Sequence, residues 1–230
     1  AGADVVIGDI DYEGAEEVAD EIEGETANTV VPLEVDVSDK QQVDEMVDTT
    51  VEEFGKLDVA FANAGIAELE APVQSYTADQ WERITSVNFD GVFYTDRAAA
   101  EVMKNQGHGS IINTASIYGL VGDDTIGTFA YAASKGGVVQ MTKTLAANLA
   151  PDVRVNAIAP GPVRTGIGQG FMKEDAEGME QVHEMIEDKT PMDRLAYPED
   201  MKGMALYLAS EASGYCTGYV YAVDGGWTSI

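Results

Sequence analysis

Short runs of apolar, β-branched residues alternate with longer amphipathic segments along the chain, and this alternation limits the possible folds more than any other feature. Such alternation is typical of a parallel β-sheet with right-handed crossovers. Because helices cover both faces of such a sheet, its strands are apolar almost throughout. Strands are expected at Ala3–Asp9, Thr29–Asp36, Leu57–Asn63, Ser110–Thr114, Val153–Ile158 and Tyr219–Val223. Helices are expected at Asp11–Gly24, from Ser38 to about Gly55, from Thr77 to about Asn105, at Phe129–Leu149 and at Pro198–Ala209.

Two of these helices begin with the sequence pattern of a capping box. In this motif a Ser or Thr side chain and a Glu or Gln three residues later bond each other's backbone N–H groups. Ser38 with Gln41 predicts one such start, and Thr77 with Gln80 predicts the other.

The length of 230 residues suits one large α/β domain. No Gly/Ser-rich or Pro-rich linker divides the chain, so we expect a single domain over residues 1–230. No apolar run approaches the roughly 18 residues of a membrane helix, and the first residues lack the pattern of a signal peptide. The single cysteine, Cys216, permits no internal disulfide. These features predict a cytoplasmic protein without membrane association.

The chain is strongly acidic, with 41 Asp and Glu residues against 13 Lys and Arg and a formal net charge of −28. This charge repels phosphate backbones, so nucleic acid is not an expected partner. The acidic residues are spread over the expected helices, between apolar positions that a disordered acidic chain would lack. Their mutual repulsion lowers stability at low salt, and salt screens it. The pattern resembles that of salt-adapted (halophilic) cytoplasmic proteins; an ordinary acidic enzyme is the alternative.

Ligands of such sheets bind outside the carboxyl ends of the strands. Polar or otherwise unusual residues stand there in this chain, namely Asp9, Asp36, Asn63, Ser116 and Pro160. We therefore expect the functional site at this edge of the sheet.

The sharpest chemical pattern is Tyr131 with Lys135, one helical turn apart and so on one helix face. A nearby ammonium group favours the phenolate and lowers a tyrosine pKa, so this pair predicts a proton donor and acceptor. Ser116 follows a strand at the same edge and can bond a substrate oxygen as charge develops on it. Asn88 lies within a long expected helix and can hold a water that relays protons. Taken singly, Tyr131 with Lys135 is more often a surface pair, Ser116 a strand-end cap and Asn88 an ordinary polar helix residue.

Together and in order, these residues resemble the short-chain dehydrogenase/reductase family over essentially the whole chain. The matching elements are Asp9, Asp36–Val37, Asn63–Gly65, Asn88, Ser116, Tyr131 with Lys135, Pro160–Thr165 and the closing Val223–Gly226. The resemblance implies a Rossmann-type doubly wound parallel sheet in one α/β domain. It also implies an oxidoreductase that moves hydride between a nicotinamide cofactor and an alcohol or ketone.

The resemblance implies catalytic roles for four residues. Tyr131 is the expected general acid/base, and Ser116 orients the substrate oxygen. Lys135 binds the nicotinamide ribose and lowers the tyrosine pKa, and Asn88 completes the proton relay. The cofactor-binding residues it implies, besides Tyr131 and Lys135, are Asp9, Asp36, Val37, Asn63, Ala64, Gly65, Pro160, Gly161, Val163 and Thr165.

Asp9 predicts which nicotinamide cofactor is used. A carboxylate at this position accepts hydrogen bonds from the adenosine ribose hydroxyls and repels a 2′-phosphate. The residues that follow, Ile10 and Asp11, supply no positive charge. NAD is therefore the expected cofactor.

Three features depart from the family pattern. The glycine-rich turn belongs about 20 residues before the ribose-binding acid, ahead of Ala1, so we expect this sequence to be an N-terminally truncated form. Gly166–Gly170 is glycine-rich but lacks the strand–turn–helix context; we interpret it as part of a substrate lid over residues 162–197. The 15-residue interval from Ser116 to Tyr131 predicts an enlarged loop between them.

The leading interpretation is NAD-dependent oxidation of a secondary alcohol of sugar, cyclic or hydroxyacyl type, or reduction of the matching ketone. The alternatives are a non-catalytic nucleotide-binding protein and an inactive fragment of the same fold. His108 and His183 are far apart in sequence, so no metal is expected. The family resemblance implies that the helices around Asp90–Met103 and Tyr131–Leu149 form subunit contacts, which predicts a homo-oligomer, a tetramer.

Overall fold

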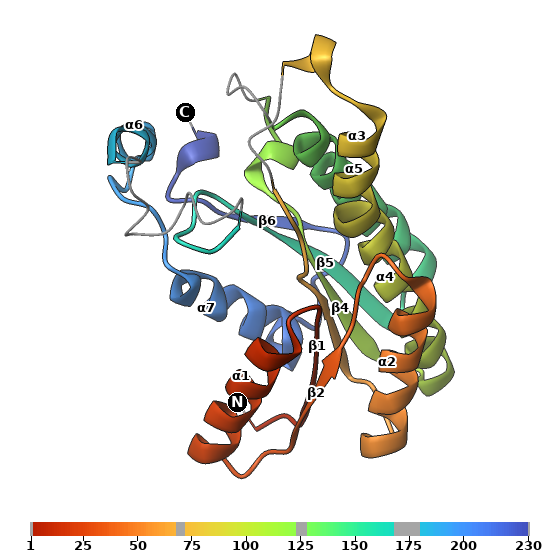
Figure 1. The fold of residues 1–230 in the computed structure, drawn as a ribbon. Coiled ribbons are helices and arrows are strands. Elements are labelled where there is room, and N and C mark those ends of the chain that lie inside the picture. Colours follow the sequence, from red (N-terminus) through yellow and green to blue (C-terminus); the bar gives the residue numbers. More distant parts are fainter. Residues whose placement is uncertain (1, 68–71, 123–127, 168–179, 230) are drawn as a thin grey trace.

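The computed structural model describes residues 2–67, 72–122, 128–167 and 180–229 (Figure 1). The strands are β1 (Val5–Asp9), β2 (Val30–Glu34), β3 (Val59–Ala62), β4 (Gly109–Thr114), β5 (Val153–Pro160) and β6 (Val220–Val223). The α-helices are α1 (Tyr12–Glu25), α2 (Lys40–Phe54), α3 (Ala78–Thr85), α4 (Gly91–Gln106), α5 (Phe129–Leu149), α6 (Glu180–Lys189) and α7 (Pro198–Ala209). Every strand and helix predicted from the sequence is present, with bounds that differ by a few residues.

The strands form a parallel arrangement covered by helices on both sides. β1 pairs with β2, and β3, β4, β5 and β6 pair in that order, all in parallel. Figure 1 shows α2, α4 and α5 on one side of the strands and α1 and α7 on the other. The predicted α/β domain of Rossmann type is therefore confirmed.

Neighbouring residues of β4 point to opposite faces of the sheet and so enter different parts of the core. Ile111 packs with Val155 in the cluster that α2 and α4 cover. Ile112 packs instead with Ile158 and with Leu208 of α7. All five side chains are at most 2 % exposed. Both faces of the sheet are therefore packed with apolar side chains at these positions.

The start of α2 differs from the predicted capping box. Asp39 is the N-cap, and its carboxylate accepts a hydrogen bond from the backbone N–H of Gln41 at 2.8 Å. The Ser38 hydroxyl donates to Asp36 Oδ1 at 2.7 Å instead. The prediction of Ser38 was wrong because Asp36 takes the Ser38 hydroxyl, and the Asp39 carboxylate, whose negative charge suits the positive end of the helix dipole, caps the helix instead. The capping box of Thr77 and Gln80 is confirmed at α3.

The long helix expected after Thr77 changes its pitch midway. α3 passes into a π-helical turn, η2 (Ser86–Asp90), which leads directly into α4. Gly107 ends α4 in the left-handed conformation, with φ 79°. Such π-helical turns are frequent at functional sites, and Asn88 lies within this one, fully buried.

The expected lid over residues 162–197 contains a helix, α6, that the sequence analysis did not predict. The two ends of this segment lie together, because Val163 and Ala196 form a parallel bridge. Arg164 extends from this bridge to α6, where its Nη2 bonds Glu187 Oε1 at 3.0 Å. Gly168 and Gly170, in the glycine-rich stretch interpreted as part of this lid, lie outside the described residues.

Within the described ranges, no helix has both the length and the apolar character needed to cross a membrane.

Candidate active site

Ser116 and Tyr131 lie together beyond the carboxyl end of β4. Ser116 Oγ accepts a hydrogen bond from the backbone N–H of Tyr118 at 3.2 Å, at the start of the 3₁₀ turn η3 (Ile117–Gly119). A side-chain hydrogen bond also joins Ser116 to Tyr131, in the first turn of α5. The Ser116 oxygen accepts from the Tyr118 N–H, and the Ser116 hydroxyl proton can be donated to a neighbouring oxygen. The serine is thus oriented toward the phenol.

Lys135 follows Tyr131 by one turn of α5 and is 2 % exposed. Its Nζ donates a hydrogen bond to the Thr114 carbonyl oxygen at 2.7 Å and lies 5.8 Å from the centre of the Tyr131 ring. Burial lowers the pKa of Lys135 to about 8. The predicted juxtaposition of Ser116, Tyr131 and Lys135 is therefore present in the structure.

The expected lowering of the Tyr131 pKa is not found. Burial raises the pKa of Tyr131 above its ordinary value, and the hydrogen bond with Ser116 offsets this only in part. Lys135 faces the Tyr131 ring and gives its hydrogen bond to the backbone of β4, so it does little to stabilise a phenolate. The prediction treated the lysine charge as dominant, whereas loss of water around the phenol outweighs it.

The side-chain amide of Asn88 bonds the backbone of the segment after β3. Its Oδ1 accepts from the Ile66 N–H and its Nδ2 donates to the Ile66 carbonyl oxygen, both at 2.8 Å. Asn88 thereby fastens the segment after β3 to η2. Gly65 fits closely here, since a Cβ on it would lie 3.3 Å from Asn88 Oδ1 and 3.5 Å from Lys135 Nζ.

The segment after β3 is also tied to β4. Asn63 Oδ1 accepts a hydrogen bond from the Thr114 hydroxyl at 3.0 Å. Asn63 and the following Ala64 are exposed, whereas Gly65 is half-buried. The three residues expected to flank the cofactor therefore line the same edge as Lys135.

The other end of this edge is acidic. Asp9 ends β1 opposite Glu34 of β2, and both residues are exposed. Asp9 Oδ1 accepts a hydrogen bond from the Asp11 N–H at 2.9 Å. Asp36 Oδ1 accepts from the backbone N–H and the hydroxyl of Ser38. A phosphate at this end would meet several negative charges.

Val37 and Gly91 bring the loop after β2 against α4. A Cβ on Gly91 would lie 2.8 Å from Val37 Cγ2, so only glycine leaves room for this valine. Val37 is half-buried as a result.

The residues after β5 are positioned by the end of β6. Gly161 donates its N–H to the Val223 carbonyl oxygen at 3.0 Å, and a Cβ on Gly161 would lie 2.7 Å from Asp224 Cα. The Asp224 carboxylate accepts from the N–H groups of Gly226 and Thr228 and so holds its own turn. The two sequence motifs Pro160–Thr165 and Val223–Gly226 are therefore one structural unit.

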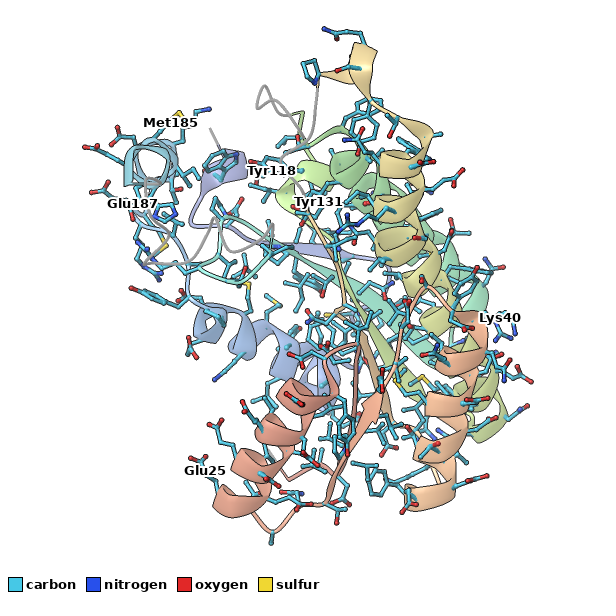
Figure 2. All side chains as sticks on the ribbon, viewed as in Figure 1. Glu25, Lys40, Tyr118, Tyr131, Met185 and Glu187 are labelled. Atoms are coloured by element: carbon cyan, nitrogen blue, oxygen red, sulfur yellow. The ribbon has the colours of Figure 1, made fainter. Side chains whose placement is uncertain are left out.

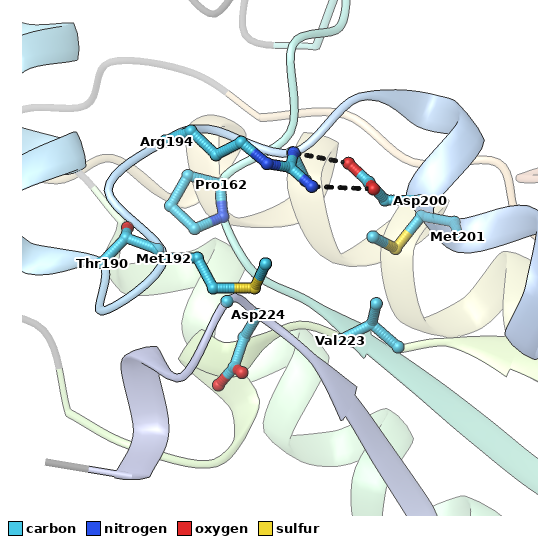
Figure 3. A pocket seen from close by; sticks show the side chains of 10 residues that line it. Pro162, Thr190, Met192, Arg194, Asp200, Met201, Val223 and Asp224 are labelled. Carbon is cyan, nitrogen blue, oxygen red and sulfur yellow. Dashed lines mark hydrogen bonds and ion pairs between the residues drawn. The ribbon is translucent and has the colours of Figure 1, made fainter.

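A small cavity of about 150 Å³ lies behind this unit, lined by residues such as Pro162, Met192, Met201 and Val223 (Figure 3). Arg194 and Asp200 form a two-pronged ion pair at its wall, with N–O distances of 2.7 and 2.9 Å. This pair holds the pKa of Asp200 down, to about 2. The residues that line this cavity do not include Ser116 or Tyr131.

Tyr118 is the site residue that the sequence analysis missed. Its ring meets the Tyr131 ring edge to face, with ring centres 6.4 Å apart (Figure 2). The signal was its place two residues after Ser116.

Among the described residues, no group of three or more His, Cys, Asp or Glu side chains is arranged to hold a metal ion.

Comparison with known proteins identifies the family. A family model described as enoyl-(acyl carrier protein) reductase matches residues 1–228. The chain belongs to the short-chain dehydrogenase/reductase family. In this family it is 40 % identical over 232 residues to the NADP-dependent (R)-specific alcohol dehydrogenase of Lentilactobacillus kefiri, covering 99 % of this chain and 88 % of that protein. It is 36 % identical over 230 residues to cis-4-hydroxycyclohexanecarboxylate dehydrogenase of Sinomonas cyclohexanicum, covering 100 % of this chain and 88 % of that protein.

A solved structure agrees with the sequence relatives. The crystal structure of a short-chain type dehydrogenase/reductase from Mycobacterium marinum superposes with a TM-score of 0.91 at 37 % identity, over 100 % of this chain and 87 % of that one. The fold and the chemistry are thereby established at the level of an oxidoreductase that acts on alcohol groups.

Proposed function

We propose that this chain transfers hydride between NAD and a secondary alcohol or the matching ketone, with Tyr131 as general acid/base. The observation that carries the proposal is the approach of Ser116, Tyr131 and Lys135 at the end of β4. A substrate oxygen placed between the Ser116 hydroxyl and the phenol receives hydrogen bonds from both. Such paired donors stabilise charge that develops on this oxygen.

The residues at this edge fit a nicotinamide dinucleotide. The Lys135 ammonium has three N–H groups, and its bond to Thr114 leaves donors for the ribose hydroxyls. Gly65 presents no side chain beside them. In this proposal Pro160, Gly161, Val163 and Thr165 hold the carboxamide end, while Asp9, Asp36, Val37, Asn63 and Ala64 flank the adenosine end. When bound, the nicotinamide supplies the hydride acceptor or donor.

Tyr131 moves the proton of the substrate hydroxyl. In reduction the phenol O–H donates to the ketone oxygen, and in oxidation the phenolate accepts the alcohol proton. Because burial raises the Tyr131 pKa, the phenol is protonated at neutral pH. We therefore expect reduction to proceed readily near neutral pH and oxidation to speed up as the pH becomes alkaline.

NAD is proposed in preference to NADP, although the related enzyme of Lentilactobacillus kefiri is named as NADP-dependent. The support is the charge at the adenosine end. Asp9 and Glu34 stand opposite each other where β1 and β2 end. A carboxylate there accepts bonds from ribose hydroxyls and repels a 2′-phosphate.

A homo-oligomer, a tetramer, is proposed on the family resemblance and on exposed apolar side chains. Phe93 of α4 is 46 % exposed, Leu206 of α7 is 54 % exposed and Tyr219 beside β6 is 63 % exposed. Side chains of this kind are enriched at the centres of protein interfaces.

The test is the variant Tyr131→Phe, which keeps the ring and removes the hydroxyl. We expect kcat to fall by roughly 10² to 10⁴, the usual range for a lost general acid/base, while NADH still binds by fluorescence. Tyr94→Phe is the matched control, since it removes a hydroxyl from a partly buried tyrosine that packs on the α4 core. Near-normal kcat in Tyr131→Phe would refute the assignment.

A further inference from the structure

Tyr118 is held in place from two directions. Its N–H donates to Ser116 Oγ, and the N–H of the next residue, Gly119, donates to the Ser116 carbonyl oxygen at 2.9 Å. Gly119 in turn lies against the α5 backbone, because a Cβ on it would be 2.7 Å from the carbonyl carbon and oxygen of Lys135. The turn η3 is thus fixed to the same helix residues that position the proposed catalytic group.

The ring of Tyr118 forms a corner with the ring of Tyr131. The two rings are nearly perpendicular, at 83°, with centres 6.4 Å apart. Tyr118 is half-buried and so keeps part of its surface open. Figure 2 shows the two side chains next to each other. An aromatic wall therefore stands beside the phenol.

We propose that Tyr118 contacts the substrate and favours a secondary alcohol or ketone whose reacting carbon belongs to a ring. This rests on the proposed function, which places the substrate oxygen between Ser116 and Tyr131. The backbone N–H of Tyr118 bonds Ser116 Oγ, and the Tyr118 ring meets the Tyr131 ring edge to face. In this proposal the carbon that carries the substrate oxygen therefore lies next to the Tyr118 ring.

Two physical reasons favour a cyclic substrate at this corner. A rigid ring presents a flat apolar face to the Tyr118 ring and buries it in one contact. It also loses little internal freedom on binding, whereas a flexible chain of equal size must be ordered. The recognition is by shape and apolar contact, so the Tyr118 ring matters more than its hydroxyl.

The experiment compares cyclohexanol with propan-2-ol as substrates of the wild-type chain and of Tyr118→Ala, Tyr118→Phe and Leu120→Ala. We expect Tyr118→Ala to lower the ratio of kcat/KM for cyclohexanol to that for propan-2-ol by about tenfold, mainly through KM. Tyr118→Phe should keep the ratio, because the ring remains. Leu120→Ala is the control for the same loop, with an exposed side chain, and should also keep it.

Saturation-transfer NMR of cyclohexanol binding, in the presence of NAD, separates this inference from the proposed function. Binding that Tyr118→Ala weakens and Tyr118→Phe retains supports the inference even if the wild-type chain oxidises neither alcohol, an outcome that would refute only the function. An unchanged substrate ratio together with unchanged cyclohexanol binding in Tyr118→Ala would overturn the inference and leave the function standing.

Discussion

Asp96 is a buried carboxylate outside the active site, and its titration makes a quantitative prediction. It lies on α4 with no exposed surface. Its Oδ2 accepts a hydrogen bond from Asn113 Nδ2 at 2.9 Å, and the same Nδ2 lies 3.1 Å from Thr142 Oγ1. Asp96 Oδ1 is buried without a hydrogen-bond partner. Burial raises the pKa of Asp96 from 3.8 to about 7.

The sign of the effect follows from where the proton is held. Between pH 4 and 7 the folded chain keeps the proton on Asp96, whereas the unfolded chain has released it. The free energy of unfolding therefore falls as the pH rises through this window and is level above it. A pKa about three units above its ordinary value, at about 1.4 kcal/mol per unit, corresponds to roughly 4 kcal/mol lost between pH 4 and pH 8.

The variant Asp96→Asn isolates this effect. Asn has the same shape, cannot ionise, and can accept the hydrogen bond from Asn113 Nδ2 through its side-chain oxygen. We expect the variant to be about as stable as wild type at pH 4 and more stable by up to about 4 kcal/mol at pH 8. The measurement is urea unfolding at several pH values in constant high salt. The other carboxylates are common to both proteins, so they cancel in the difference.

A control of opposite sign is Asp44→Asn on α2. Lys40 and Arg97 both pair with Asp44, and the hydrogen bond from Lys40 is the largest cause of its lowered pKa. A carboxylate with a lowered pKa stabilises the fold at pH values above its ordinary pKa, and this stabilisation is lost as the pH falls. Asp44→Asn should therefore cost stability at pH 8 and little at pH 3. Parallel curves for Asp96→Asn and wild type from pH 4 to 8 would refute the reasoning.

Three further outcomes are expected. Asp9→Ala should lower the ratio of kcat/KM with NAD to that with NADP at least tenfold, and a wild-type preference for NADP would contradict the assignment of Asp9. The thermal midpoint should rise as KCl increases from about 0.1 M to about 3 M, because salt screens the repulsion within a chain of net charge −28; a flat or falling midpoint would contradict salt adaptation. Light scattering in high salt should give about four chain masses, and a monomeric mass would remove the proposed tetramer.

The alternation of apolar runs was enough to predict the strands, because a strand covered on both faces needs little besides apolar residues. The exact start of α2 was not predictable in the same way, since Ser38 and Asp39 are both good caps and the choice depends on Asp36, which takes the Ser38 hydroxyl. The π-helical turn around Asn88 was also missed. A helical pattern shows which residues are apolar, not where the pitch changes to meet a neighbouring loop.

The sequence predicted which residues meet at the site but not how each one is used. Spacing placed Tyr131 and Lys135 on one face of α5, as found. Where Lys135 sends its hydrogen bond depends on the Thr114 carbonyl, which comes from β4 and is invisible to spacing along a helix. The same holds for Asn88, whose amide is taken up by Ile66 from the segment after β3.

The direction of the Tyr131 pKa follows from this difference. The fixed charge of Lys135 could be read from the sequence, but the loss of water around the phenol arises only when η3 and α5 come together. Burial acts on both groups at once, raising the pKa of Tyr131 and lowering that of Lys135. A ligand that bonds the remaining N–H groups of Lys135 favours its charged form. That charge then stabilises the phenolate. We therefore expect filling of the proposed cofactor site to raise the pKa of Lys135 and to lower the pKa of Tyr131, relative to the protein alone.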